Sequence, residues 1–412
     1  MSDTNDSSLK TKRSQLSIHR PMRLCLALFV GAYAVWAAPT AYRWINIARL
    51  ESIGAKIEFE EQPCSLLQKY TFGVNATSRV EAIGLHPDQP LTDDQLALLA
   101  KFPEVTHIYL EGEHITDDVM EYVAQLPNLE SLGVSTGVTD HGYAQLVKAD
   151  SLKTLLLCHV TVNDDMLKSF GMLSSLRDLG FMESRFHSAD FGHLAGLPQL
   201  NKIAIMDSSF EEEVRNLSKL HTLEGLYLIN APFTDDDCAN LSDLPRLKEL
   251  RIHGTQISDA GIRHFANLQS LEHLHLKGES ITDDGLAHVA GLHRLKHLDL
   301  SSTKIGDEGL AHLNELSHLE HLDLSDTEVS DAGLTHLNGL SHLEYLDLWG
   351  TDVSNTGLKQ IASMPSLGWV SLHDTKVTAD GLAIFTESDL GPSESAVRIE
   401  LAELFPSSDE AN

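Results

Sequence analysis

The chain has 412 residues and a formal net charge of −30, with 30 Lys and Arg against 60 Asp and Glu. This acidic balance argues against a broad nucleic-acid-binding surface, which requires clustered basic residues. The four cysteines are too few for a disulfide framework in a chain of this length, and their spacing matches no zinc motif. The length fits two ordinary domains or, if the sequence repeats, one elongated solenoid.

Residues 24–42 form an uncharged and largely apolar run of 19 residues, LCLALFVGAYAVWAAPTAY. About 20 such residues cross a membrane as a helix, so the run predicts a transmembrane segment. Residues 1–23 carry five basic and two acidic side chains, and the positive-inside tendency keeps such a tail in the cytoplasm. We therefore expect a single-pass membrane protein with a basic cytoplasmic tail (1–23), a signal anchor (24–42) and all later residues outside the cytoplasm.

A cleaved signal peptide is the alternative, because residues 35–37 offer small side chains at cleavage positions, and cleavage would make the protein secreted. The apolar run exceeds the usual signal-peptide core of about 7–15 residues, which favours the uncleaved anchor. Residues 43–79 then read as a juxtamembrane helix and a strand. We expect this segment to form an N-terminal cap.

An LxxLxL frame recurs through residues 80–390. It starts at Val80, Val105, Leu129, Leu152, Leu176, Leu200, Leu223, Leu247, Leu271, Leu295, Leu319, Leu343 and Leu367. Successive starts lie 23 to 25 residues apart, and the last six steps are all 24. A fixed period of this length predicts stacked units that share one continuous core.

Each unit reads as a strand followed by a short helix. Leu322 and Leu324 lie two residues apart and point to one face of a strand, whereas His321 and Asp323 point to the other face. Ser330 then offers an N-cap oxygen for a helix whose leucines recur at helical spacing. Stacking such units predicts an α/β solenoid, a horseshoe with a parallel sheet on its concave side and short helices on its convex side.

This pattern resembles the leucine-rich repeat family, whose repeats of roughly 20–29 residues carry an L-x-x-L-x-L core. Its TxISDxGLxxLxxL form is most similar to the F-box-associated, AMN1-like type and to repeats of bacterial surface proteins. Threonines occupy the turn where familiar repeats of the family carry Asn, and their hydroxyls can satisfy the turn backbone; they are Thr255, Thr303, Thr327, Thr351 and Thr375. A ubiquitin-ligase-type substrate receptor is implied by resemblance only. We find no F-box-like segment before the repeats and expect a bacterial membrane-anchored form.

Residues 391–412 predict a closing strand at 396–401 and an acidic tail, which together suit a C-terminal cap.

The sequence contains no phosphate-binding glycine loop, nucleophile elbow, HExxH motif or EF-hand loop. Acidic runs at 117–118, 164–165, 235–237 and 283–284 fall at the start of repeat helices. There they serve as N-caps and helix-dipole partners. We therefore expect no enzyme activity, no cofactor and no small-molecule substrate.

Outward-facing side chains of the C-terminal repeats predict a surface of His, Asp and aromatic residues on the concave face. It comprises His273, His297, His321, Asp299, Asp323, Asp347, Tyr345, Trp349 and Trp369. Neighbouring strands lie about 4.8 Å apart, so His273, His275, His297 and Asp299 could close around an ion. Copying of near-identical repeats explains the same residues without a ligand, and we assign no metal site.

The concave positions of earlier repeats are apolar instead. We take Leu156, Met182, Met206, Tyr227 and Ile229 as the primary partner-binding site, because exposed apolar patches mark interaction surfaces and thioethers suit adaptable contacts. The alternative is that the N-terminal extension or the tail covers them. The expected function is a membrane-anchored binding module that contacts a protein partner of unknown identity through its concave face. A structural acidic spacer without a dedicated ligand is the second hypothesis.

Overall fold

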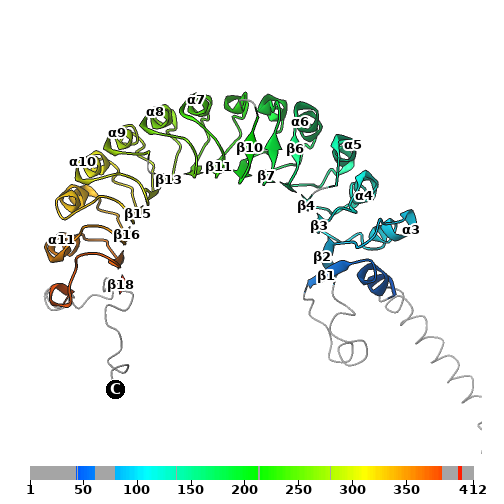
Figure 1. Ribbon diagram of the computed structural model, residues 1–412, viewed down its shortest axis with the longest axis horizontal. Coiled ribbons are helices and arrows are strands. Elements are labelled where there is room, and N and C mark those ends of the chain that lie inside the picture. The colour runs from blue at the N-terminus through cyan, green and yellow to red at the C-terminus, as the bar shows by residue number, and fades with distance from the viewer. Residues whose placement is uncertain are drawn as a thin grey trace, which may run out of the picture.

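The computed structural model describes residues 43, 45–60, 79–135, 137–211, 214–278, 280–382 and 398–400. They form a curved solenoid with strands along its inner side and helices along its outer side (Figure 1). The predicted basic tail (1–23) and signal anchor (24–42) lie outside the described residues. Within the described ranges, no helix is long and apolar enough to cross a membrane.

One 15-stranded sheet lines the whole concave side, and its strands follow one another in chain order. All neighbouring strands pair in parallel except the first two, which are antiparallel. The strands are β1 Ala55–Glu60, β2 Arg79–Leu85, β3 His107–Glu111, β4 Ser131–Ser135, β5 Thr154–Cys158, β7 Asp178–Met182, β9 Lys202–Met206, β11 Gly225–Ile229, β12 Glu249–His253, β13 His273–Lys277, β14 His297–Asp299, β15 His321–Asp323, β16 Tyr345–Asp347, β17 Trp369–Ser371 and β18 Arg398–Glu400. Every strand of this sheet from β3 to β17 begins two residues after a frame residue, so the predicted repeat register is confirmed.

The segments that flank the repeats supply the two end strands of the sheet. Strand β1 comes after a helical segment at residues 45–51 and pairs with the edge of β2. Strand β18 lies within residues 396–401, where the sequence predicts a closing strand, and it pairs with β17. Both pairings cover edge strands that would otherwise present unpaired backbone groups.

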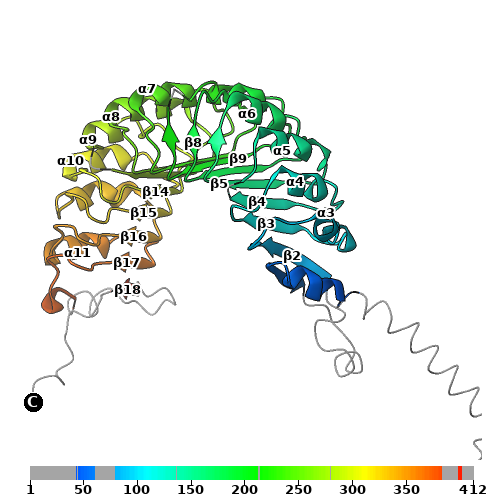
Figure 2. The same ribbon diagram turned by 45° about the vertical axis from the view of Figure 1, so that its right-hand side comes forward.

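The convex side consists of short α-helices and 3₁₀ turns, which Figure 2 shows on the outer side of the arc. The α-helices are α3 Asp93–Leu96, α4 Asp117–Val123, α5 Asp140–Ala144, α6 Asp164–Phe170, α7 Asp235–Cys238, α8 Asp259–Ile262, α9 Asp283–Leu286, α10 Asp307–Leu310 and α11 Asn355–Ile361. The 3₁₀ segments are η2 Leu99–Lys101, η3 Gln145–Lys148, η4 Phe191–Leu194, η5 Leu217–Lys219, η6 Ala239–Leu241, η7 Arg263–Asn267, η8 Ala311–Leu313 and η9 Gly333–Gly339. Three two-residue strands, β6 Thr161–Val162, β8 Arg185–Phe186 and β10 Ser209–Phe210, form a second small sheet.

The short helix predicted after Ser330 is present as the 3₁₀ helix η9 at residues 333–339. The Ser330 hydroxyl donates to Asp307 Oδ2 of the preceding repeat at 2.6 Å, and its own oxygen accepts from the Ala332 amide at only 3.4 Å. The shorter bond of Ser330 therefore links two repeats, and its capping bond to the helix is the weaker contact.

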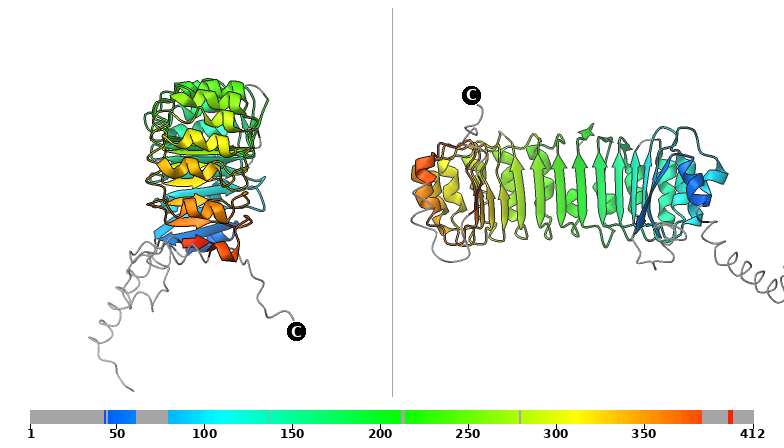
Figure 3. Two further views of the ribbon diagram at one scale, coloured as in Figure 1. Left: turned by 90° about the vertical axis from the view of Figure 1, so that its left-hand side faces the viewer. Right: turned by 90° about the horizontal axis from the view of Figure 1, so that it is seen from below.

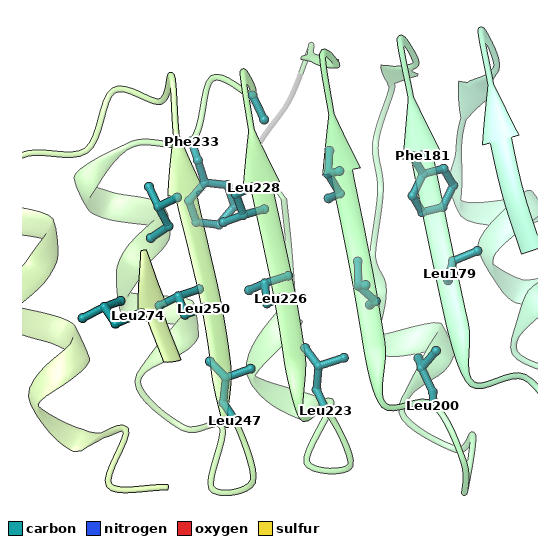
Figure 4. Packing of buried hydrophobic residues seen from close by; sticks show 14 of the residues in the cluster. Leu179, Phe181, Leu200, Leu223, Leu226, Leu228, Phe233, Leu247, Leu250 and Leu274 are labelled. Carbon is teal, nitrogen blue, oxygen red and sulfur yellow. The ribbon is translucent and has the colours of Figure 1, made fainter. Parts of the chain in front are cut away.

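The core runs continuously between the sheet and the convex segments. Leu298, Leu322 and Leu346 are buried as predicted, and Figure 4 shows the same packing in the central repeats. Aromatic rings fill part of the central core, where Phe186 packs edge-on against Phe181 and Phe210 with centroids 5.1 and 5.0 Å apart. Adjacent repeats thus share each layer of side chains, as a solenoid requires.

The predicted acidic runs lie in the first turns of their helices, and they also bond the next repeat. Oδ1 of Asp117, Asp164, Asp235 and Asp283 accepts a backbone N–H of the following repeat at 2.7 to 2.8 Å. The threonine hydroxyls behave as predicted at the turn: those of Thr303, Thr351 and Thr375 donate to the carbonyl three residues earlier at 2.6 to 2.8 Å. Thr327 makes the same bond at 2.5 Å, whereas Thr255 accepts from the Ile257 amide at 3.4 Å.

The concave face as a candidate binding surface

Each long strand presents three side chains to the concave face, at its first, third and fifth residues, because alternate residues of a strand share a face. Parallel pairing without register shifts aligns these positions into three columns that run along the solenoid. We call them the first, middle and third columns. Figure 3 (right) shows the strands side by side from this side.

Five rings of the first column form one continuous stack, which we call the ring ladder. His273 and His297 have ring centroids 4.3 Å apart, and His297 and His321 have centroids 4.2 Å apart. The stack continues from His321 to Tyr345 at 5.4 Å and from Tyr345 to Trp369 at 3.9 Å. Strands repeat at about 4.8 Å, which is close to the spacing of stacked rings, so identical positions in adjacent repeats bring their rings face to face.

Stacking and burial keep part of the ring ladder uncharged. Burial is the main reason that the pKa of His297 falls to about 4, and the neighbouring His321 and His273 add to it. The pKa of His273 is also lowered, again chiefly by burial. These two imidazoles are therefore neutral near pH 7.

The middle column contains three carboxylates on adjacent strands, which we call the acid row: Asp299, Asp323 and Asp347. Burial alone would raise the pKa of Asp299, but hydrogen bonds from His275 and Ser301 outweigh it and hold the pKa at about 2. The His275 Nδ1 lies 3.4 Å from Asp299 Oδ2, and the Ser301 amide donates to Oδ1 at 2.9 Å. Asp299 is therefore ionised near pH 7, and the hydrogen bonds from His275 and Ser301 partly compensate its negative charge.

Asp323 is less well compensated than its neighbour. Burial raises its pKa, and the carboxylates of Asp299 and Asp347 on either side raise it as well. Hydrogen bonds from the Ser325 amide and hydroxyl, at 2.9 and 2.6 Å, act in the opposite direction without reversing the shift. The centre of the acid row is therefore a site of like-charge repulsion.

Trp349 lies beside the acid row and is one of the few exposed large apolar side chains, at 40% exposure. Its backbone amide donates to Asp347 Oδ1 at 3.0 Å, and its indole Nε1 donates to Asp374 Oδ2 at 3.0 Å. These two bonds fix an accessible indole next to a carboxylate.

The four residues considered as a possible ion site, His273, His275, His297 and Asp299, are not arranged like metal ligands. The His273 and His297 rings stack face to face, and of the three histidines only His275 bonds Asp299. Over the described part of the chain, no group of three or more His, Cys, Asp or Glu side chains could hold a metal ion.

The predicted apolar residues Leu156, Met182, Met206, Tyr227 and Ile229 are each half-buried on the concave face. Four apolar side chains, Cys158, Met182, Met206 and Ile229, are direct neighbours in the third column. We call these four the apolar row. Leu156 lies in the middle column and leans over Gly180, where an added Cβ would meet Leu156 Cδ1 at 2.8 Å.

Tyr227 has a different environment from the one predicted. Its hydroxyl donates to Glu249 Oε2 at 2.7 Å, and its ring lies between Lys202 Nζ at 4.8 Å and Arg251 Cζ at 5.0 Å. Arg251 in turn donates to Glu249 Oε1 at 2.7 Å. Tyr227 therefore belongs to a charged cluster that separates the apolar row from the ring ladder.

Sequence reasoning missed a depression of about 670 Å³ where β5, β7, β9 and β11 end. His159, Glu183, Asp207 and Asn230 line it, and each has a left-handed backbone with φ between 48° and 55°. The available signal was the recurrence of Asp and Asn, residues that tolerate positive φ, one position after the third column.

The repeat geometry agrees with comparisons to known proteins. The sequence profile for a leucine-rich repeat region matches residues 94–336, and a second leucine-rich repeat profile matches residues 339–362. The chain therefore belongs to the leucine-rich repeat family.

A solved structure shows the same fold. A leucine-rich repeat protein of Leptospira interrogans is 16% identical, with a TM-score of 0.50 over 78% of this chain and 90% of that one. An internalin of Listeria monocytogenes is 21% identical, with a TM-score of 0.49 over 77% of this chain and 90% of that one. A comparison with curated proteins finds no match.

Proposed function

We propose that this chain is a binding module that contacts a protein partner through the concave face of its repeats, as leucine-rich repeat domains generally do. The observation that carries the proposal is the apolar row at the centre of the arc. Binding energy concentrates in a few apolar or aromatic anchors, while charged surroundings mainly steer the encounter. Met182 and Met206 can adapt to a partner, because the unbranched thioether has several accessible rotamers.

A capture experiment tests this proposal. The full chain carrying Met206→Asp should lose a partner that the unchanged chain retains, because a charge would be buried in the contact. Met172→Asp is the matched control, since Met172 follows convex helix α6 and is 63% exposed. Equal retention by all three proteins would argue against the apolar row as the contact. Failure of the unchanged chain to retain any partner would favour a structural spacer, the function that the net charge of −30 supports.

The proposal includes a location. Residues 24–42 would anchor the chain in a membrane with residues 1–23 in the cytoplasm and the repeats outside it. The uncharged 19-residue run and the basic tail before it support this topology. A reporter fused after Asn412 that is active only outside the cytoplasm is the expected result, and cytoplasmic activity would overturn it. A mature N-terminus at Ala38 would replace the anchor by a cleaved signal peptide.

A further inference from the structure

The concave face differs in charge between its two halves. Strands β9 to β12 carry the basic side chains Lys202 and Arg251, and both contact Tyr227 in the charged cluster. Strands β14 to β16 carry the acid row in the middle column. The basic charges over β9 to β12 are compensated, since Arg251 pairs with Glu249 at 2.6 Å and the same carboxylate acts on Lys202. A basic partner would therefore be attracted mainly by the acid row.

The centre and the C-terminal end of the acid row have no cationic partner among the described residues. Among the ion pairs between described residues, His275 pairs with Asp299 at 3.4 Å, whereas Asp323 and Asp347 have no such partner. These carboxylates lie on neighbouring strands, about 4.8 Å apart. A partly buried carboxylate between two others is stabilised most by a positive charge placed beside it.

Acidic side chains also flank the ring ladder on its other side. Glu320 precedes His321 in the chain and lies close enough to act on His297, and Glu344 precedes Tyr345 and is exposed. The basic Lys296 directly precedes His297 in the chain, and its charge lowers the pKa of His273. The rings of His321 and Tyr345 therefore lie between two lines of carboxylates over β15 and β16.

The ring ladder and Trp349 fit a cation better than an anion. Neutral imidazoles offer a ring nitrogen as an acceptor and add no positive charge. Neighbouring rings occupy the faces within the ladder, but Trp349 stands outside it with an exposed indole next to Asp347. A guanidinium can stack on an indole while it bonds a carboxylate.

We propose that the concave face of β14 to β17 binds an extended arginine- or lysine-rich segment of the protein partner, with its cations on Asp323 and Asp347 and against Trp349. This inference rests on the proposed function and names the chemistry of the partner. The apolar row anchors the partner at the centre of the arc, and the acid row receives its basic segment toward the C-terminal end. A carboxylate-to-amide substitution tests it cleanly, because Asn keeps an oxygen that accepts the bonds from Ser325 or Trp349.

The test uses the full chain and a fluorescein-labelled peptide of alternating Arg and Ser, with an alternating Glu and Ser peptide as the negative probe. Fluorescence anisotropy at near-physiological ionic strength gives the dissociation constants. Losing two charge-assisted contacts in Asp323→Asn/Asp347→Asn should weaken Arg-peptide binding by about tenfold or more. Trp349→Ala should weaken it by about threefold or more. The charge-matched control is Asp284→Asn/Glu308→Gln, two exposed residues on convex helices α9 and α10, and it should change binding by less than about twofold.

Equal loss in the concave and convex double variants would show attraction to net charge alone and would overturn the inference. Absence of Arg-peptide binding to the unchanged chain would overturn it as well. Thermal melting of each variant verifies folding. The proposed function is tested separately by Met206→Asp, so loss of capture there together with an unaffected Arg peptide would remove this inference and leave protein binding by the apolar row in place.

Discussion

The imidazole rings of His297 and His321 lie face to face, with centroids 4.2 Å apart and planes inclined by 14°. They come from equivalent positions of two repeats, 24 residues apart in the chain. A proton on His297 meets partial burial and the neighbouring imidazoles, so the stack favours uncharged His297. The same repetition that builds the core therefore also sets the charge state of the surface.

The titration of His297 should show this coupling. NMR of its ring protons should give a pKa of about 4. Burial and the two flanking rings lower this pKa, so His321→Ala should raise it toward the ordinary value of about 6.5. A pKa near that ordinary value in the unchanged protein would contradict the stacked arrangement.

Stability should fall with acidity because of the same residue. The folded-state pKa of about 4 lies below the unfolded-state value, so the unfolded chain binds more protons between these two values. The contribution of His297 to the free energy of unfolding is therefore present above about pH 6.5 and is lost as the pH falls to about 4. Urea unfolding across this range should show a smaller loss in His297→Gln than in the unchanged chain. An equal loss in both proteins would mean that other groups carry the dependence.

Leu322 should be among the most sensitive core positions, because it is fully buried between neighbouring leucines of the repeats. Leu322→Ala should lower the free energy of unfolding by about 2–5 kcal/mol through lost contacts and a residual cavity. Chemical denaturation measures this change. A cost within experimental error would mean that the inward face is assigned wrongly.

Asp331 should stabilise the contact between two repeats. Its Oδ1 accepts from the amides of Ser354 and Gly357 at 2.7 and 3.0 Å, and its Oδ2 accepts from the Ser354 hydroxyl. Asp331→Ala leaves these donors without their acceptor and should cost about 1–3 kcal/mol. Asp284→Ala, in the first turn of α9 but exposed, should stay within about 0.5 kcal/mol. Similar costs for both would reduce the role of Asp331 to that of an ordinary first-turn acid.

The strand register was predictable from the sequence, because inward and outward side chains alternate with a period of two and the frame never loses phase. The columns of the concave face follow directly from that register. Side-chain contacts within the columns do not. The sequence pattern places Tyr227 in an apolar patch. Its partners Lys202 and Arg251 lie on neighbouring strands, and only the rotamers of the folded chain bring them around its ring.

The convex acids show a similar limit. Their place in the first turn of each helix is a local property that the sequence displays. Their hydrogen bonds to the next repeat depend on how repeats stack. The spacing does contain the signal: Gly357 follows Asp331 by one repeat plus two residues, and an added Cβ there would lie 2.5 Å from Asp331 Oδ1. Glycine at this position leaves room for the carboxylate.

Site-specific photo-crosslinking tests the central claim, that the concave face is the surface that meets a protein partner. A photoreactive amino acid would replace Met206 on the apolar row, Trp349 beside the acid row, or Met172 on the convex side, each in the full chain in its native cells. We predict a discrete adduct of the same partner from positions 206 and 349 and none from position 172. Adducts of equal yield from position 172, or none from either concave position, would contradict the account.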